Sequence, residues 1–405
     1  MADHYSDLPS STKIQPSPFK VAIPDDDLRS FKELLKISRI GPTTYENLQE
    51  DARFGISKAW LQNAKTEWEN FDWRTAEAHI NSFPNFKSDV EHDGETFSIH
   101  FIALFSSNPA AIPVVFLHGW PGSFLEFLPI LSTLKSKYPN PHSLPYHIIV
   151  PSLPGFTFSS GPSLNKDSTA ITMSAIIHSL LTAHLGFPKY IAQGGDIGSK
   201  VGRLLAIQFP ECVGVHINFI VMREPDPPVS GDTISIAERD GLARAAAWQK
   251  TGTAYAMEHG TRPATIGLAL SASPIALLCW IGEKFIEWTD VTPPLHTILE
   301  AVTLYYLTDT FPRSIYTYRR AFAPEEERKD APDWDTRKVP AGKAFGYSWF
   351  PKELLPMPRA WVETMGEQGL TFFRQHDAGG HFAALERPET LLGDFEDFVK
   401  ESWKA

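Results

Sequence analysis

The sequence predicts an α/β protein whose mostly parallel central sheet is interrupted by a helical insertion. Short apolar runs alternate with helical segments between residues 96 and 222, and the alternation resumes between residues 343 and 405. Such runs, separated by helices, are typical of parallel strands that helices cover on both faces. Residues 223–342, by contrast, show helical patterns without strands. We expect this insertion to form a lid over the carboxyl ends of the strands, where open α/β sheets bind ligands.

Residues 1–95 predict a helical extension that precedes the sheet. Asp25 or Asp26 can cap the start of a first helix. A second helix would place three residues, at spacings of four, on one face. The alternating run from Phe97 to Phe105 then predicts a strand. The apolar positions that define the two helices are Leu28, Phe31, Leu34 and Leu35 in the first, and Trp60, Ala64 and Trp68 in the second.

The other elements follow from the same two periodicities. The predicted strands are Pro113–Leu117, His147–Val150, Tyr190–Gln193 and Gly214–Val221 before the insertion, and Ala344–Phe350 and Leu370–Arg374 after it. The predicted core helices are Leu125–Leu134, Thr169–Leu185, Ser199–Phe209 and Leu391–Val399. The chain therefore divides into an N-terminal extension (1–95), a first part of the core (96–222), a lid inserted after the sixth strand (223–342) and a second part of the core (343–405).

Composition excludes some partners and indicates a compartment. The formal net charge of −11 argues against nucleic acid and against a polybasic membrane contact. Cys212 and Cys279 lie far apart and form no disulfide framework, so we expect a reducing, cytoplasmic environment. The N-terminus lacks the pattern of a signal peptide. The uncharged segment Ile266–Ile281 contains Pro274 and is short for a membrane span, so we interpret it as buried lid helices and expect no membrane anchor.

The most informative motif is Gly194-Gly-Asp-Ile-Gly198, which joins a predicted strand to a predicted helix. It has the form of a nucleophile elbow, G-x-S-x-G, with Asp196 in the serine position. The glycines permit a tight turn, and the helix N-terminus behind it offers free N–H groups. The competing interpretation is a glycine-rich turn in which Asp196 only caps the helix.

Two further loops favour the catalytic interpretation. His118-Gly-Trp-Pro-Gly-Ser123 lies between a strand and a helix, so the backbone N–H groups of Trp120 and Ile197 could form an oxyanion hole. Gly379-Gly-His381 follows the last predicted strand, where this type of fold carries its catalytic histidine. His376, five residues earlier, is the competing candidate.

The acid that would orient the histidine should follow the strand Ala344–Phe350. Glu353 stands at that position and is our candidate. The alternatives are Asp333, Asp335 and Asp377.

An aspartate nucleophile implies a two-step reaction. An ionised Asp196 can displace a leaving group at an sp³ carbon and form a covalent ester. His381, held by Glu353, would then activate the water that hydrolyses the ester. If the substrate is an epoxide, the alkoxide that leaves needs a proton, which a tyrosine hydroxyl can supply. The lid contains five tyrosines, any of which could equally be a packing residue: Tyr255, Tyr305, Tyr306, Tyr316 and Tyr318.

Taken together, these motifs resemble the epoxide hydrolases of the microsomal type, within the α/β-hydrolase superfamily. The resemblance extends over nearly the whole chain and includes Phe83-Pro-Asn-Phe86, His118-Gly-Trp-Pro121, Gly194-Gly-Asp-Ile-Gly198, Ser273–Lys284 and Gly379-Gly-His-Phe382. It implies an α/β-hydrolase fold, Asp196 as nucleophile, His381 as base and one proton-donating tyrosine from each of two lid segments. Tyr255 matches the first of these. Tyr318 matches the second, although Tyr316 is close to it. The resemblance also implies a possible homodimer.

The predicted reaction is therefore the hydrolysis of an apolar or aryl epoxide to a vicinal diol, with water as the second substrate and with no metal or cofactor. A haloalkane dehalogenase shares the nucleophile and the histidine, but resemblance to that family implies a tryptophan where this chain has Ile197. A non-catalytic ligand-binding protein on the same fold would usually lack a member of the triad. A serine esterase is disfavoured because the elbow carries Asp196.

Overall fold

The computed structural model describes residues 4–322 and 337–404, and within them nine strands form one sheet. The strand order is β1-β2-β3-β5-β4-β6-β7-β8-β9. Strands β5, β4, β6, β7, β8 and β9 run parallel, whereas β1, β2 and β3 add antiparallel pairs at one edge. The mostly parallel sheet is thus confirmed. The strands of the parallel part are β4 (Ile112–Leu117), β5 (Tyr146–Pro151), β6 (Tyr190–Gly194), β7 (Cys212–Ile217), β8 (Ala344–Trp349) and β9 (Phe372–Gln375).

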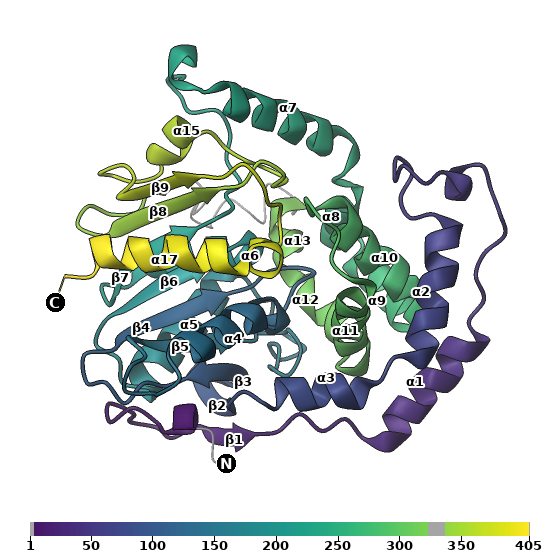
Figure 1. The fold of residues 1–405 in the computed structure, drawn as a ribbon, viewed down its shortest axis with the longest axis horizontal. Helices are drawn as coiled ribbons and strands as arrows, with labels where there is room; N and C mark the ends of the chain where they lie inside the picture. The colour runs from purple at the N-terminus through teal and green to yellow at the C-terminus, as the bar shows by residue number, and fades with distance from the viewer. Residues whose placement is uncertain (1–3, 323–336, 405) are drawn as a thin grey trace.

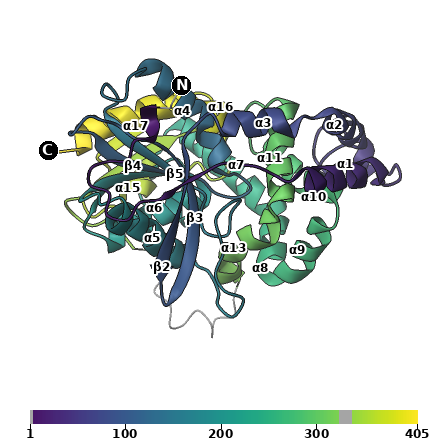
Figure 2. The same ribbon diagram turned by 90° about the horizontal axis from the view of Figure 1, so that it is seen from below.

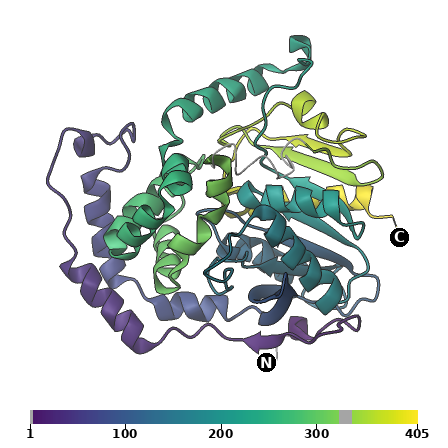
Figure 3. The ribbon, with the colours of Figure 1, turned by 180° about the vertical axis from the view of Figure 1, so that it is seen from behind.

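Helices cover both faces of the sheet, as the apolar runs predict. Along β4, Val114 and Phe116 pack into one core and Val115 and Leu117 into the other. Helix α17 (Pro388–Ser402) crosses the face that is in front in Figure 1 and contacts α4 (Leu128–Lys137). The other face, seen in Figure 3, carries α5 (Ala170–Ser179), which continues into the π-helical turn η4 (Leu180–His184), and α6 (Asp196–Gln208).

The N-terminal extension is not helical throughout. Strands β1 (Ser17–Phe19) and β2 (Asn85–His92) extend the sheet beyond β3 (Glu95–Leu104). The alternating burial of β2 is the pattern of a half-covered strand. Helix α1 (Asp25–Ile37) has Pro24 at its N-cap, with no side-chain cap, so Asp25 and Asp26 lie inside the first turn and neither is the cap. In the first turn, their negative carboxylates interact favourably with the positive end of the helix dipole.

Helices of the N-terminal extension pack against the lid. Helix α2 (Lys58–Asn70) buries Ala64 and Trp68, and α3 (Trp73–Ile80) leads back to β2. Figure 2 shows α1 and α2 on the side of the lid helices that faces away from the sheet. The indole of Trp68 donates a hydrogen bond of 2.7 Å to the Thr303 hydroxyl in the lid. The N-terminal arm and the lid thus form one packed unit.

The lid consists of helices, as predicted. In the described residues it begins after β7 and runs to Phe322. The lid therefore follows the seventh strand of the described residues, where the sixth was expected; both β1 and β2 lie in the extension that was predicted to be helical. Its helices are α7 (Ile236–Thr251), α8 (Ala254–Thr261), α9 (Pro263–Ser271), α10 (Pro274–Glu287), α11 (Leu295–Leu307), α12 (Thr310–Ser314) and α13 (Tyr316–Phe322).

The apolar segment Ile266–Ile281 lies in α9 and α10, which meet at 116°. By length and composition the two helices pass together as a candidate span, but no single helix among the described residues is long and apolar enough to cross a membrane. Ser273 caps α10, since its side chain accepts a hydrogen bond from the Ala276 N–H. Pro274 occupies the first turn, where a backbone N–H would have no partner within the helix. The break between the two helices is therefore encoded locally.

Candidate active site

Asp196 lies at the sharp turn between β6 and α6, as the elbow motif predicts. Its φ angle is +45°, a left-handed conformation that a residue with a side chain rarely adopts. The turn depends on close backbone packing, because a Cβ on Gly198 would lie 2.0 Å from the carbonyl oxygen of Leu117 in β4. Only glycine permits this approach. The turn therefore brings the start of α6, and Asp196 with it, against the loop that follows β4.

The loop after β4 holds one oxygen of the Asp196 carboxylate. The backbone N–H of Trp120 donates a hydrogen bond of 2.7 Å to Asp196 Oδ1. A Cβ on Gly119 would lie 2.1 Å from the same oxygen, so this glycine leaves room for the carboxylate. Ile197 is the next residue of α6, in the first helical turn, where backbone N–H groups have no partner within the helix. Both predicted oxyanion N–H groups thus belong to residues beside this carboxylate.

His118 stabilises this loop. Its Nε2 accepts a hydrogen bond of 3.1 Å from the Leu153 N–H, and its Nδ1 lies 3.2 Å from the Gly119 carbonyl. Burial lowers the pKa of His118 to about 4, so the ring is neutral. A neutral imidazole can accept at one nitrogen and donate at the other, as these two contacts require.

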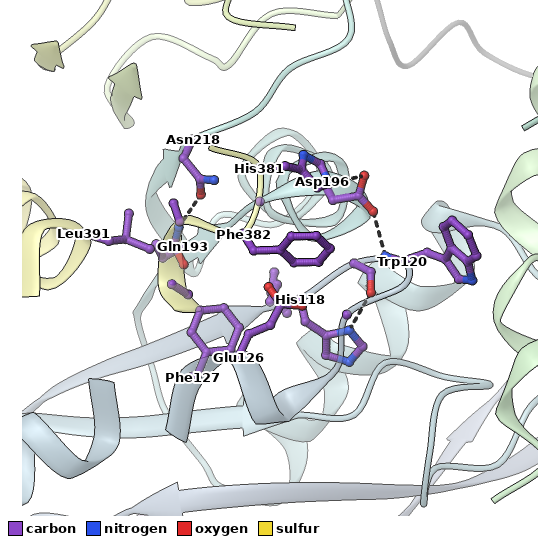
Figure 4. A pocket seen from close by; sticks show the side chains of 16 residues that line it. His118, Trp120, Glu126, Phe127, Gln193, Asp196, Asn218, His381, Phe382 and Leu391 are labelled. Carbon is purple, nitrogen blue, oxygen red and sulfur yellow. Dashed lines mark hydrogen bonds and ion pairs between the residues drawn. The ribbon is translucent and has the colours of Figure 1, made fainter. Parts of the chain in front are cut away.

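His381 lies between two carboxylates. Its Nδ1 is 2.7 Å from Glu353 Oε1, and its Nε2 is 3.5 Å from Asp196 Oδ2. Figure 4 shows His381 and Asp196 side by side, with Trp120 on the other side of the carboxylate. The three residues proposed from sequence as nucleophile, base and acid are therefore in one chain of contacts, although they come from loops after three different strands.

The competing candidates lie elsewhere. His376 Nε2 is 2.6 Å from Asp394 Oδ2, in a cluster with Arg374. The side chain of Asp377 is exposed. Asp333 and Asp335 lie outside the described residues.

The two carboxylates determine the protonation of His381. Burial lowers its pKa, but the charge of Glu353 and the contacts with Asp196 and Glu353 outweigh burial. The net effect raises the pKa of His381 well above the ordinary value of 6.5. The imidazole therefore holds a proton more strongly than the side chain of a free histidine does.

Tyr255 and Tyr318 lie together on the lid side of Asp196. The ring of Tyr255 stacks on Trp120 at 5.3 Å between centroids, and that of Tyr318 contacts both Trp120 and Tyr255. Burial raises the pKa of both hydroxyls, and the negative charge of Asp196 raises both further. Both tyrosines therefore hold their protons at neutral pH.

The other lid tyrosines have different surroundings. The ring of Tyr316 lies near the loop at Gly155 and Gly161. The Tyr305 hydroxyl donates a hydrogen bond of 2.8 Å to the Gly122 carbonyl. The ring of Tyr306 packs against Phe31 of the N-terminal arm. Of the five, the structure brings Tyr255 and Tyr318 next to Trp120.

Two titratable residues near the site were not identified from the sequence. Glu126 follows the Trp120 loop and lines a cavity together with Asp196 and His381. The ammonium group of Lys284 is buried 4.9 Å from the centre of the Tyr255 ring and pairs with Glu283. The signal available for Lys284 was its position just after the apolar run that begins α10. Glu126 could not be identified in this way, because acidic residues are common in the first turn of helices.

No group of three or more His, Cys, Asp or Glu side chains among residues 4–322 and 337–404 could hold a metal ion. The site therefore consists of carboxylates, an imidazole, tyrosine hydroxyls and backbone N–H groups.

The chain matches two family models and several known proteins. The model described as "Epoxide hydrolase N terminus" matches residues 16–127, and "alpha/beta hydrolase fold" matches residues 112–233. The solved structure of Aspergillus niger epoxide hydrolase is 49% identical, with a TM-score of 0.91 over 99% of this chain and 100% of that one. Epoxide hydrolase 1 of Sus scrofa is 30% identical over 419 residues, which cover 94% of this chain and 88% of that protein. The silkworm Bombyx mori juvenile hormone epoxide hydrolase, 24% identical with a TM-score of 0.83 over 96% of this chain and 95% of that one, shares the fold.

The sheet, the elbow and these matches define an α/β-hydrolase-fold enzyme. Within that class the chain belongs to the epoxide hydrolase family. The resemblance inferred from the motifs is thus confirmed, and it is this family, not that of the haloalkane dehalogenases, that the comparisons support.

Proposed function

We propose that this epoxide hydrolase opens its substrate by direct attack of Asp196 on an epoxide carbon. The observation that carries the proposal is the placement of one carboxylate between two sets of groups. Trp120, Tyr255 and Tyr318 are on its lid side, and His381 with Glu353 is on the other. An oxygen of Asp196 forms a bond to carbon while the carbon–oxygen bond of the strained ring breaks.

The ring oxygen leaves as an alkoxide and takes a proton from Tyr255 or Tyr318. Both hydroxyls are protonated at neutral pH because burial and the nearby Asp196 charge raise their pKa values. A second tyrosine beside the first donates a hydrogen bond to the same oxygen, which spreads the developing charge.

Formation of the ester changes the state of His381. Esterified Asp196 carries no negative charge, so one of the interactions that raise the pKa of His381 disappears. The imidazole then releases its proton more easily and can act as a base at neutral pH. Glu353 remains bound to Nδ1 and orients the ring.

Water completes the reaction. Its oxygen attacks Cγ of Asp196 while His381 Nε2 takes a proton, and Trp120 and Ile197 N–H groups stabilise the resulting oxyanion. The bond between Cγ and the alkyl oxygen then breaks, and the departing oxygen takes the proton from His381. The carboxylic acid that remains on Asp196 returns its proton to the tyrosinate, and His381 takes back from solvent the proton that it released there when the ester formed. The sum is one epoxide and one water converted to one diol.

We further propose that the substrate is an apolar or aryl epoxide. The rings of Trp120, Tyr255, Trp288, Phe311 and Tyr318 lie within 6.3 Å of one another in successive contacts, on the lid side of the nucleophile. Aromatic walls favour apolar substrates and aryl groups, since they offer both burial and stacking.

A single turnover in heavy-oxygen water tests the ester route. With enzyme in excess over styrene oxide, the first diol should contain no solvent oxygen, because its new oxygen comes from Asp196. The label should instead appear in the peptide that contains Asp196, as measured by mass spectrometry. Solvent label in the first diol, with none in that peptide, would exclude the ester. A chloroalkane serves as the control substrate and should release no halide.

A further inference from the structure

A cavity of about 520 Å³ adjoins the candidate active site, and its lining includes neither Tyr255 nor Tyr318. We call it the rear cavity. Exposed residues of the N-terminal arm and of α11 form its mouth, and Gly122 and Glu126 lie at its inner end. The residues of the mouth are Asp72, Thr75, His79 and His296.

A much smaller space, the water chamber, adjoins Asp196 itself. It offers about 20 Å³ to the centre of a water molecule, which is room for about one water. Its walls include Asp196, His381 and Asn218, and it shares Gly122 and Glu126 with the rear cavity. Figure 4 shows Glu126 pointing into this space from the side of Phe127, with Phe382 beside it. Glu126 and Gly122 are therefore the boundary between the two spaces.

The position of the Glu126 carboxylate depends on Gly122. A Cβ on Gly122 would lie 1.4 Å from Glu126 Oε1, so the carboxylate rests directly against this glycine. Burial raises the pKa of Glu126 to about 8, and the His381 and Asp196 charges modify that value in opposite directions. At neutral pH the group is a carboxylic acid, which can donate a hydrogen bond from one oxygen and accept at the other.

The two-step reaction requires water to arrive from a second direction. Once the ester has formed, the alkyl group occupies the lid side of Asp196, between the nucleophile and the tyrosines. Water that reaches His381 Nε2 must then come from a side that the alkyl group does not block. The rear cavity has exposed residues in its lining and meets the water chamber at Gly122 and Glu126. The water chamber beside Asp196 and His381 has the size of the one molecule that the step consumes.

We propose that the hydrolytic water enters through the rear cavity and that Glu126 holds it in the water chamber for attack on the ester of Asp196. Glu126 is thus a positioning residue for the water and takes no part in ring opening. This inference rests on the ester route proposed above.

Substitutions at the inner end and along the wall test the two parts of the proposal. Glu126→Leu removes the hydrogen bonds to the water, and Glu126→Gln, which can still donate and accept, should restore most of the rate. Ala301→Trp places a large ring in the rear cavity from α11, at a residue that does not line the water chamber. Ala264→Trp, at an exposed position of α9 that lines neither space, is the control.

The measurement is the formation and decay of the alkyl-enzyme in a single turnover, followed by mass spectrometry after rapid quenching. Glu126→Leu and Ala301→Trp should slow decay at least about tenfold and leave formation within about twofold. The Ala264→Trp control should change neither.

Decay that is unaffected by both Glu126→Leu and Ala301→Trp would overturn the inference. Slow decay in Glu126→Leu alone would overturn the rear route, and equal slowing of formation and decay would reveal a general structural effect and overturn the positioning role. An enzyme that makes diol with no alkyl-enzyme in any variant would instead overturn the ester route itself.

Discussion

The residues around Asp196 divide the proposed reaction between two sides of one carboxylate. Tyr255 and Tyr318 are on the side where the epoxide oxygen must lie, and His381 is where water must be activated. The protonation of the tyrosines and of the imidazole suits the step that we propose for each. The tyrosines hold their protons, as donors must, and in the proposed reaction the imidazole releases its proton more easily once the nucleophile has lost its charge.

Removing the tyrosine hydroxyls tests their role as proton donors. Tyr255→Phe and Tyr318→Phe should each leave partial activity, because the other hydroxyl can still protonate the alkoxide. The double variant should lose ring opening by a factor of about 10² to 10⁴, the usual contribution of general acid catalysis. The rate of alkyl-enzyme formation measures this loss directly.

Tyr316→Phe is the matched control, since Tyr316 lies two residues from Tyr318 in the same helix and near a different loop. This variant should form the alkyl-enzyme at the same rate as the native enzyme. If Tyr316→Phe lost the activity and Tyr318→Phe kept it, the assignment would be reversed.

Most residues of the site could be predicted from the sequence, because they lie in motifs that directly follow predicted strands. Asp196, His381 and Glu353 were each predicted from position, and the structure brings them together. Tyr316 and Tyr318 could not be separated, because their difference is a rotation about one helix axis that only packing determines. Glu126 was missed because its importance arises from two cavities, and cavities have no signature in a local sequence.

At the scale of elements, the contact between α6 and β4 determines where the nucleophile stands. Gly198 is the residue that makes this contact possible, since its missing side chain lets α6 approach the Leu117 carbonyl. The strained φ of Asp196 persists because the surrounding structure holds the turn on both sides.

Gly198→Ala should therefore displace Asp196 from the Trp120 N–H. A shift of about 1 Å in a reacting group can cost about a hundredfold in rate, so we expect a loss of that size in diol formation, measured under saturating substrate. Circular dichroism should show a folded protein.

Gly393→Ala is the appropriate comparison, because Gly393 is also in a helix, α17, and has no atom within 4 Å of an added Cβ. That variant should retain full activity. A Gly198→Ala enzyme as active as Gly393→Ala would show that the turn tolerates the shift.

The predicted elements of the core were largely confirmed, and the differences have local causes. The strand predicted over Gly214–Val221 ends at Ile217, because the apolar run continues into the segment that leaves the sheet toward the lid. The sequence predicts a helical extension where β2 lies, since the charged, exposed positions of this strand leave only a weak apolar signal. The apolar signal of β3, β4, β5 and β6 is stronger, because most of their residues are buried.

At the scale of the whole molecule, the N-terminal arm is part of the support of the lid. Phe31 of α1 packs against Trp68 of α2 and Tyr306 of α11, at centroid distances of 5.2 and 5.3 Å. The sequence predicted the apolar faces of α1 and α2 but not their partner, because such long-range packing leaves no local pattern.

Phe31→Ala should destabilise this unit by about 3–5 kcal/mol, the usual cost of emptying a buried phenylalanine site. Urea denaturation measures the loss. Ile37→Ala, in the same helix but 76% exposed, should change stability by less than about 0.5 kcal/mol. Equal effects of the two substitutions would contradict the packing of the arm against the lid.

The bond between Trp68 and Thr303 spans 235 positions of the chain. During synthesis, the ribosome therefore releases the arm long before it has made the helices that cover it. Until then the nascent chain presents the apolar faces of α1 and α2 to solvent, which is the condition that recruits chaperones or leads to aggregation. We expect efficient production of this enzyme to depend on how well the cell protects its first eighty or so residues while the remainder is translated.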